Sequence, residues 1–351
     1  MPPATYELTV KEAFIEPGNT VINGVRLRKF QEEVFESLGK YRRVLLRAPT
    51  GSGKTFTLVL GAIKSSLEKT LYPVVGIYPS RALVYDQARS VKEALTRMGF
   101  SCVNGTTFKG RLNINGEDKG EVTFNVYILT SEVKELPELP RLGNSIVLTV
   151  PEYPYIYITA MKKAASQVIE AAMKFDFDTA LKKVGESVSR SEIRNIWTYF
   201  SFFFNGYWFV DEFHLYSGIA RNSMVTLVEM FEKYNSYVKG NKTVVFSSAT
   251  PMPISVDKVI EAKTSDSGER IRKRTRVIFH LTGKDPQQEV VNAASPDSGK
   301  KTCVIVDRVY YVAQLCNKVN DAALVWGLDK SYGNCRRVDK GLEKEGFIIG
   351  N

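Results

Sequence analysis

RRVLLRAPTGSGKTFT, residues 42–57, joins a short apolar run to a glycine-rich loop. The run of Val44, Leu45 and Leu46 is typical of a buried strand, and the loop precedes a segment that we expect to form a helix from Lys54 onwards. Backbone N–H groups of such a loop, together with the amino end of the helix, attract phosphate oxygens. The stretch therefore predicts a nucleotide-binding α/β protein with strand, loop and helix in this order.

The loop residues have separate expected tasks in holding ATP and Mg²⁺. Lys54 would reach the β and γ phosphates, and Thr55 would supply a hydroxyl to Mg²⁺. Ala48 stands where the usual pattern G-x-x-x-x-G-K-[ST] has glycine, and a chance turn before a helix is the alternative. The residues expected to bind the nucleotide here are Thr50, Gly51, Ser52, Gly53, Lys54 and Thr55.

A second stretch that could take part in catalysis is FVDEFHLYSG, residues 209–218, where an apolar run ends in two acids. The carboxyl ends of parallel strands border an open crevice, which is where α/β proteins place their ligands. We expect Asp211 to hold Mg²⁺, Glu212 to polarise the attacking water, and His214 to link the nucleotide site to the rest of the protein. A strand that simply ends in solvent is the alternative.

The segment just before the loop, LRKFQEEVFESL at residues 27–38, has the apolar spacing of an amphipathic helix. Gln31 lies on this helix at a distance suited to reading the adenine edge. A glutamine on the helix surface is the alternative. The expected apolar face consists of Phe30, Val34, Phe35 and Leu38.

Further candidates stand near the ends of other expected strands. Arg81 lies between a strand and a helix in GIYPSRALVYDQ, where it could meet a phosphate of a bound nucleic-acid strand. Thr149 is a second candidate for contact with nucleic acid. Ser248 and Thr250 in TVVFSSATP are hydroxyls that could bond the two acids. A solvated arginine, a strand-end turn and ordinary turn residues are the respective alternatives.

Composition indicates a folded protein with an anionic partner. The formal net charge of +10 favours nucleic acid, although the lysine-rich surface of a thermophile would give a similar balance.

The four cysteines form no C-x-x-C pair, so we expect neither a zinc site nor a disulfide framework. This cysteine usage predicts a protein of the reducing cytoplasm. Two histidines are too few for a multi-histidine metal nuclease site. No run approaches the roughly 18 apolar residues of a membrane helix, so we expect no membrane partner.

The order of glutamine, phosphate loop, Arg81, acid pair and Ser-Ala-Thr resembles the first motor lobe of superfamily-two helicases. D-E-F-H followed by L-Y, together with YPSRALVYDQ, is similar to the helicase subunit of CRISPR type I systems, subtypes I-A and I-D. The resemblance implies a RecA-like doubly wound parallel sheet, with ATP and Mg²⁺ as cofactors. It also implies ATP-driven translocation along single-stranded DNA, with a guide-RNA effector complex and a separate HD nuclease subunit as partners.

On this resemblance we expect four regions along the chain. Residues 1–24 form an N-terminal segment, and residues 25–258 form the first RecA-like lobe. Apolar spacing of three and four predicts helices inserted into that lobe at about 156–204, whose apolar face packs in the core or docks a partner. A charged linker at 259–274, in which a basic cluster could instead face nucleic acid, leads to the start of a second lobe at 275–351.

The start of the second lobe has too few residues for a complete RecA-like sheet, and no later arginine motif follows. We therefore expect weak hydrolysis unless more protein is supplied. Two other functions stay open at this point. One is a superfamily-two helicase that acts on RNA or in DNA repair, and the other is a nucleotide-binding scaffold that recruits a nuclease without efficient turnover.

Overall fold

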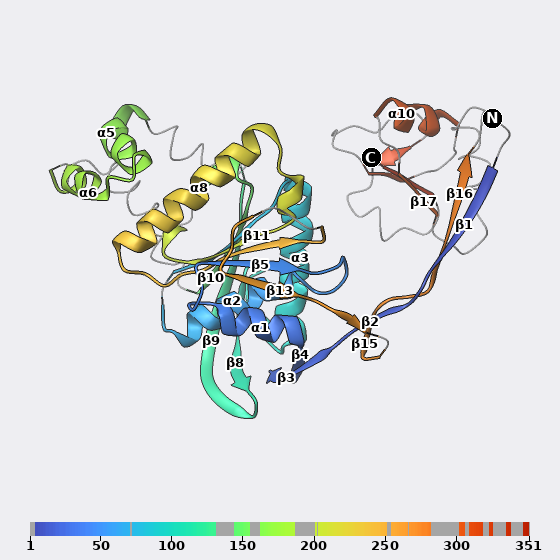
Figure 1. The fold of residues 1–351 in the computed structure, drawn as a ribbon, viewed down its shortest axis with the longest axis horizontal. Coiled ribbons are helices and arrows are strands. Elements are labelled where there is room, and N and C mark those ends of the chain that lie inside the picture. Colours follow the sequence, from blue (N-terminus) through green and yellow to red (C-terminus); the bar gives the residue numbers. More distant parts are fainter. Residues whose placement is uncertain are drawn as a thin grey trace. The chain divides into compact units, whose positions relative to one another are not determined.

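The chain divides into two compact units in the computed structural model. The larger unit is Lys11–Lys273, and the smaller unit combines Met1–Val10 with Arg274–Asn351. Figure 1 shows the strands of the larger unit with helices packed around them. The residues described are 4–70, 72–130, 144–154, 162–186, 201, 203–250, 254–265, 267–281, 302–305, 309–318, 323–325, 335–337 and 347–350.

The larger unit is built on one sheet whose central strands are parallel. The order from one edge is β13-β5-β12-β11-β6-β10-β9, and each neighbouring pair in this run is parallel. The expected α/β fold with a largely parallel, RecA-like sheet is confirmed here. The bounds are β5 Arg43–Arg47, β6 Val74–Ile77, β9 Glu117–Leu129, β10 Ser145–Thr149, β11 Tyr207–Val210, β12 Val244–Ser248 and β13 Lys258–Glu261.

Two hydrophobic cores lie on opposite faces of these parallel strands. Successive side chains of a strand point to opposite faces, so Val44 and Leu46 of β5 pack in one core and Leu45 packs in the other. The strands β6, β10, β11 and β12 are buried along their whole length, as expected for strands covered on both faces. The first core includes α1 Lys29–Ser37, α2 Phe56–Leu67 and α3 Arg81–Arg97, and the second includes α5 Lys162–Met173, α6 Phe177–Glu186 and α8 Gly218–Tyr237.

The helices inserted before β11 use their apolar face for core packing. Val168, Ala171 and Ala172 of α5 are buried in the second core with Phe177 and Ala180 of α6. Helices therefore lie within the predicted insertion at Lys162–Met173 and Phe177–Glu186, and these buried residues pack in the core. Met161, the side chain of Ala164 and residues 187–200 lie outside the described part of the chain.

An antiparallel extension of the sheet was not predicted. Beyond β9 the sheet continues through β8, β3 and β4, each antiparallel to its neighbour, with the short β7 beside β8. Asn115 and Gly116, both with positive φ, turn the chain between β8 and β9, and Asn-Gly is a strong hairpin signal. The bounds are β3 Pro17–Ile22, β4 Val25–Arg28, β7 Ser101–Cys102 and β8 Thr107–Ile114.

Strands also occupy the region that we expected to be a charged linker. Residues 258–261 form β13 at the edge of the main sheet, and β14 Thr264–Ser265 and β15 Glu269–Arg272 pair with β2 Ala13–Ile15. The charged side chains that suggested a linker are typical of edge strands, where they discourage pairing with other chains. The N-terminal segment is likewise shared, because β2 lies in the larger unit and β1 Ala4–Val10 in the smaller one.

In the smaller unit β1 pairs antiparallel with β16 Thr275–Leu281. A second sheet has the parallel order β17-β20-β18-β19, beside α10 Val309–Lys318. Cys316 and Cys335 form a disulfide that was not predicted, since two cysteines 19 residues apart carry no recognisable pattern. The bounds are β17 Thr302–Ile305, β18 Ala323–Val325, β19 Arg336–Arg337 and β20 Phe347–Gly350. Within the described ranges no helix is long and apolar enough to cross a membrane.

Candidate nucleotide-binding site

The glycine-rich loop connects the end of β5 to the start of α2, which begins at Phe56 and therefore two residues later than expected. Gly51 and Gly53 have φ of 78° and 82°, a left-handed conformation that favours glycine. A Cβ at Gly53 would lie 2.8 Å from Nη1 of Arg28, so a larger residue there would displace the end of the Arg28 side chain. The sequence thus folds into a loop whose backbone is free of side chains where a phosphate would approach.

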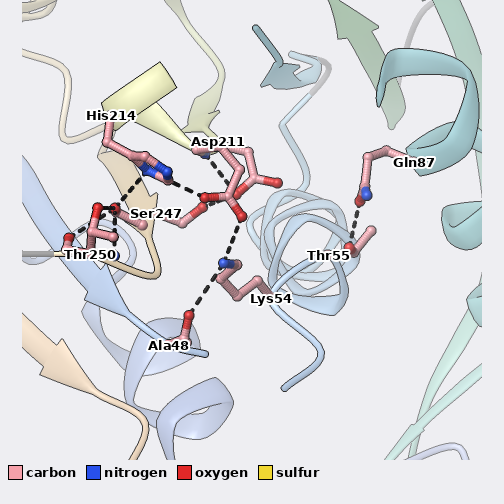
Figure 2. A network of polar contacts seen from close by, with 10 residues as sticks. Ala48, Lys54, Thr55, Gln87, Asp211, His214, Ser247 and Thr250 are labelled. Carbon is pink, nitrogen blue, oxygen red and sulfur yellow. Dashed lines mark hydrogen bonds and ion pairs between the residues drawn. The ribbon is translucent and has the colours of Figure 1, made fainter. Parts of the chain in front are cut away.

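Lys54 joins this loop to the acid pair. Its Nζ lies 2.9 Å from Oε1 of Glu212 and donates to the Ala48 carbonyl at 3.2 Å. The Lys54 side chain is only 9% exposed and that of Glu212 21%, so the ion pair is largely shielded from water. Figure 2 shows the Lys54 amine directed at the carboxylates that follow β11. The fold therefore brings Lys54 of the loop into direct contact with Glu212.

The acids are positioned by the end of β11 and a sharp turn after it. The Asp211 N–H donates to the Ile77 carbonyl and continues the pairing of β11 with β6. Glu212 then adopts φ of 45°, a left-handed conformation that costs a residue with a side chain about 1 kcal/mol or more. This backbone strain lies at the acid expected to handle water, where the turn directs its carboxylate towards Lys54.

Asp211 is held by a neighbouring strand. Its carboxylate accepts hydrogen bonds from the Ser247 hydroxyl and, at 3.0 Å, from the Glu212 N–H. Burial raises the pKa of Asp211 despite the hydrogen bond from Ser247, and the Glu212 carboxylate adds to the rise. The folded protein therefore holds this carboxylate at a cost, which a nearby cation would offset.

The hydroxyls of the Ser-Ala-Thr segment contact different groups from those expected. Ser248 bonds Nδ1 of His214 at 2.9 Å and the Thr250 carbonyl at 2.9 Å, and neither Ser248 nor Thr250 has a described hydrogen bond to the acids. The reason is strand register: Val210 pairs with Phe246, which places Ser247 opposite Asp211. Ser247 was missed by the sequence analysis, although it lies in the quoted motif.

The side chains of Gln31 and Thr55 are engaged within the protein. Gln31 is 5% exposed and its Nε2 donates to the Gly53 carbonyl at 3.0 Å, so the alternative of a surface glutamine is wrong. Thr55 donates its hydroxyl to Oε1 of Gln87 in α3, away from Asp211 (Figure 2). Gln87 was missed because nothing in a helical glutamine indicates that it will reach the loop.

These contacts unite a glycine-rich loop, a preceding glutamine and a pair of acids. Residues 28–135 match the DEAD/DEAH box helicase family. The helicase segment contains Gln31, Lys54 and Arg81 but ends before the acids, which the fold brings to it. Residues 28–135 are therefore similar to the DEAD/DEAH box helicases, a class of nucleic-acid-dependent ATPases.

Solved structures support the fold of the helicase domain. The DUF1998 helicase MrfA, described as bound to DNA and AMPPNP, has a TM-score of 0.55 and 14% identity, over 91% of this chain and 42% of MrfA. MrfA described as bound to DNA has a TM-score of 0.54 and 14% identity, over 89% of this chain and 40% of MrfA. This chain thus spans about two fifths of the length of MrfA, and identity this low shows the fold alone. A comparison with curated proteins found no match.

The two residues expected to contact nucleic acid differ in the solvent exposure of their side chains. Arg81 is exposed at the first turn of α3, directly after the N-cap Ser80, within the helicase segment. Thr149 is fully buried at the end of β10, and its hydroxyl donates to the Leu129 carbonyl at 2.6 Å. A role for the Thr149 side chain in touching nucleic acid is therefore wrong, because the hydroxyl serves the sheet.

The donor set around the glycine-rich loop fits Mg²⁺ and a nucleotide. Mg²⁺ prefers oxygen ligands and usually binds one or two carboxylates together with substrate phosphates. Asp211 and Glu212 supply carboxylates, and the buried Oε2 of Glu212 and Oγ of Ser52 have no hydrogen-bond partner. Within the described residues no group of three or more His, Cys, Asp or Glu could hold a metal by itself. The site therefore suits a metal that arrives with phosphate.

Asp211→Asn is expected to raise the free energy of unfolding at neutral pH by about 1 kcal/mol, because it removes a poorly compensated, partly buried charge. A carboxyl whose pKa is raised on folding binds its proton more tightly in the folded state. The penalty is absent below the unfolded pKa and grows as the pH rises through the folded pKa. Thermal unfolding at several pH values should therefore show a gain at neutral pH that shrinks towards about pH 4.

Asp257→Asn is the matched control for this measurement. The exposed Asp257 carboxylate accepts hydrogen bonds from the N–H groups of Arg42 and Arg43, both at 2.9 Å, and an asparagine oxygen can do the same. We expect no gain in stability from this variant. A loss of stability from Asp211→Asn at neutral pH would show that its carboxylate is instead well compensated.

Proposed function

We propose that this chain is an ATP-dependent helicase or translocase that moves along DNA. The observation that carries the proposal is the 2.9 Å contact between Nζ of Lys54 and Oε1 of Glu212. It unites a loop suited to binding phosphate with an acid suited to orienting water, and hydrolysis of ATP requires both.

Each side chain has a proposed task in hydrolysis. Lys54 would bind the β and γ phosphates. Asp211 would hold Mg²⁺, which supplies positive charge against the phosphate oxygens, and Thr55 would join it once its hydroxyl turns from Gln87. A phosphate that took the Lys54 amine would release the Glu212 carboxylate from its present partner. Glu212 would then be free to accept a hydrogen bond from the attacking water. Gln31, held at the loop, would read the adenine edge.

Coupling of hydrolysis to movement is assigned to His214. Its Nδ1 lies 3.4 Å from Oε2 of Glu212 and bonds the Ser248 hydroxyl, which in turn contacts Thr250. A change at Glu212 would therefore act first on the neighbouring His214 and then, through the hydrogen bond between His214 and Ser248, on the end of β12. These contacts lead from the water-handling acid to the segment that follows the strand.

DNA is the proposed track. MrfA is described as bound to DNA, and the formal net charge of +10 favours a polyanion, because Lys and Arg neutralise phosphates whatever the sequence. Arg81 would contact a backbone phosphate at the amino end of α3. Contacts to the backbone suit a motor that must ignore base sequence.

The finer proposal is a role in CRISPR type I interference, with a guide-RNA effector complex and a separate HD nuclease as partners. Its support is the resemblance of DEFHLY, residues 211–216, to the helicase subunit of those systems. Retention of this chain on a purified guide-RNA complex with an opened DNA target would test this role, and a duplex target without the guide complex is the control.

The motor is tested by ATP hydrolysis without nucleic acid, with single-stranded DNA, and with RNA of the same sequence. We expect DNA to increase turnover more than RNA does. Greater stimulation by RNA would favour an RNA helicase, and nucleotide binding without stimulated turnover would favour a scaffold. Failure to bind nucleotide at all would overturn the proposal.

A further inference from the structure

Arg28 lies against the phosphate loop without belonging to it. It ends β4 just before α1, and its guanidinium donates to the Ser52 carbonyl in the loop. The Arg28 side chain is only 16% exposed, and Nη1 is the atom that a Cβ at Gly53 would approach to 2.8 Å. One edge of the loop is thus covered by a cation that is 26 positions away from Lys54 in the sequence.

The other side of the same guanidinium is held by β15. Nε and Nη2 of Arg28 donate to the two carboxylate oxygens of Glu269 at 2.9 and 2.5 Å, a bidentate pair. The hydrogen bonds from Arg28 lower the pKa of Glu269, so its carboxylate is ionised at neutral pH. β15 also approaches the loop by its backbone, because a Cβ at Gly51 would lie 3.6 Å from the Ile271 carbonyl oxygen.

We propose that Arg28 and Glu269 form a latch that holds β15 against the phosphate loop and opens when a nucleotide binds. The inference rests on the proposed nucleotide site and adds a way to regulate it. Arg28 is one cation shared by the loop and by Glu269, and a triphosphate at the loop carries more negative charge than one carboxylate. The guanidinium therefore turns towards the nucleotide, and Glu269 loses its partner.

The position of β15 gives the latch a consequence. β15 pairs with the short β2 through only three residues, so few backbone hydrogen bonds hold it once Glu269 is released. β15 ends at Arg272, and the chain passes from the larger to the smaller unit between Lys273 and Arg274. A nucleotide bound at the phosphate loop thereby makes the segment that leads out of the larger unit more mobile. Glu269 acts through Arg28 and is a positioning residue.

The two ends of the latch should have opposite effects on nucleotide binding. Glu269→Gln removes the competitor for Arg28 and is expected to tighten the Kd for Mg²⁺-AMPPNP about two- to fivefold, as for a partly exposed ion pair. Arg28→Lys loses the planar fork and is expected to weaken binding. If the ion pair only stabilised the fold, both variants would instead bind the nucleotide more weakly than the parent.

Hydrogen exchange of residues 269–272 is the second readout, and it needs no catalysis. In the parent, these amides should exchange faster with Mg²⁺-AMPPNP than without it. In Glu269→Gln they should exchange fast without nucleotide and show little further change. Glu261→Gln is the matched control, since Glu261, on the edge strand β13 of the main sheet, pairs with Arg47 at 3.0 Å and has similar exposure, 50% against 58% for Glu269. It should leave both readouts unchanged.

The outcomes separate the latch from the proposed function. Suppose that the parent binds Mg²⁺-AMPPNP, but the hydrogen exchange of β15 is the same with and without nucleotide, or Glu269→Gln does not tighten binding. The latch is then overturned, whereas the proposed nucleotide site stands. If the parent binds no nucleotide, both are overturned. Thermal unfolding of each variant shows whether it has folded, and Glu269→Asp, which keeps the charge, should restore part of the parent behaviour.

Discussion

Lys54→Ala is expected to weaken nucleotide binding about a hundredfold or more, because charge-assisted hydrogen bonds contribute roughly 1.5–3 kcal/mol each. The Lys54 amine is the shielded cation that faces the acids, and Glu212 is its partner at 2.9 Å. Removing it takes away the phosphate contact and leaves Glu212 without a counter-charge. Titration with a fluorescent ATP analogue in the presence of Mg²⁺ measures the change.

Lys64→Ala is a matched control for this variant, since Lys64 lies on α2, the helix that follows the loop, and its amine stands 5.7 Å from the centre of the Phe35 ring. It should bind nucleotide as the parent does. If Lys54→Ala also bound nucleotide with parental affinity, the glycine-rich loop would not be a phosphate site. The proposed ATP-dependent function would then be overturned.

Glu212→Gln is expected to lower kcat by about 10²–10⁴ while nucleotide binding remains, which is the usual range for loss of a residue that positions or deprotonates water. The glutamine amide is nearly the same size as the carboxylate but carries no charge. It therefore removes the attraction to Lys54 and leaves the amine free for phosphate. Single-turnover hydrolysis and an independent binding titration separate the two effects.

Glu170→Gln, on the inserted helix α5, is the control for this second variant, because its carboxylate forms an exposed ion pair with Lys174. It should not alter kcat. Equal losses in binding and turnover for Glu212→Gln would assign this acid to holding Lys54 rather than to handling water.

The local parts of the site could be predicted because their signals lie close together in the sequence. The apolar run, the glycines and Lys54 stand within one short stretch, and the strand, loop and helix formed in that order. The start of α2 at Phe56 instead of Lys54 is within the usual uncertainty of helix ends. The apolar run before Asp211 likewise became β11, since burial on both faces of a parallel strand is visible as a continuous apolar run.

Contacts that depend on strand register could not be predicted. Whether Ser247 or Ser248 meets Asp211 is decided by the pairing of β11 with β12, and a shift of one residue would exchange their directions. Thr149 was misjudged for a related reason, because β10 lies inside the sheet with both neighbours paired. Neither fact is present in the local pattern of one strand.

Contacts across long stretches of sequence were also invisible. Arg28 and Glu269 are 241 residues apart, and the charged segment around Glu269 has the composition of a linker. The pairing of β15 with β2, together with the approach of the Ile271 carbonyl oxygen to Gly51, reveals that this segment lies against the loop. The edge strands of the larger unit are thus where composition was least informative, since exposure and edge pairing favour the same polar residues.

The pairing of β1 with β16 has a consequence during synthesis on the ribosome. Val10 meets Thr275, so the partner of the first strand emerges on the order of 10–50 s later at ordinary rates of elongation. In that interval Lys11–Lys273 becomes available as an uninterrupted stretch, whereas β1 has no strand to join. The larger unit can therefore mature during translation, and the smaller unit must close afterwards around a strand made near the start.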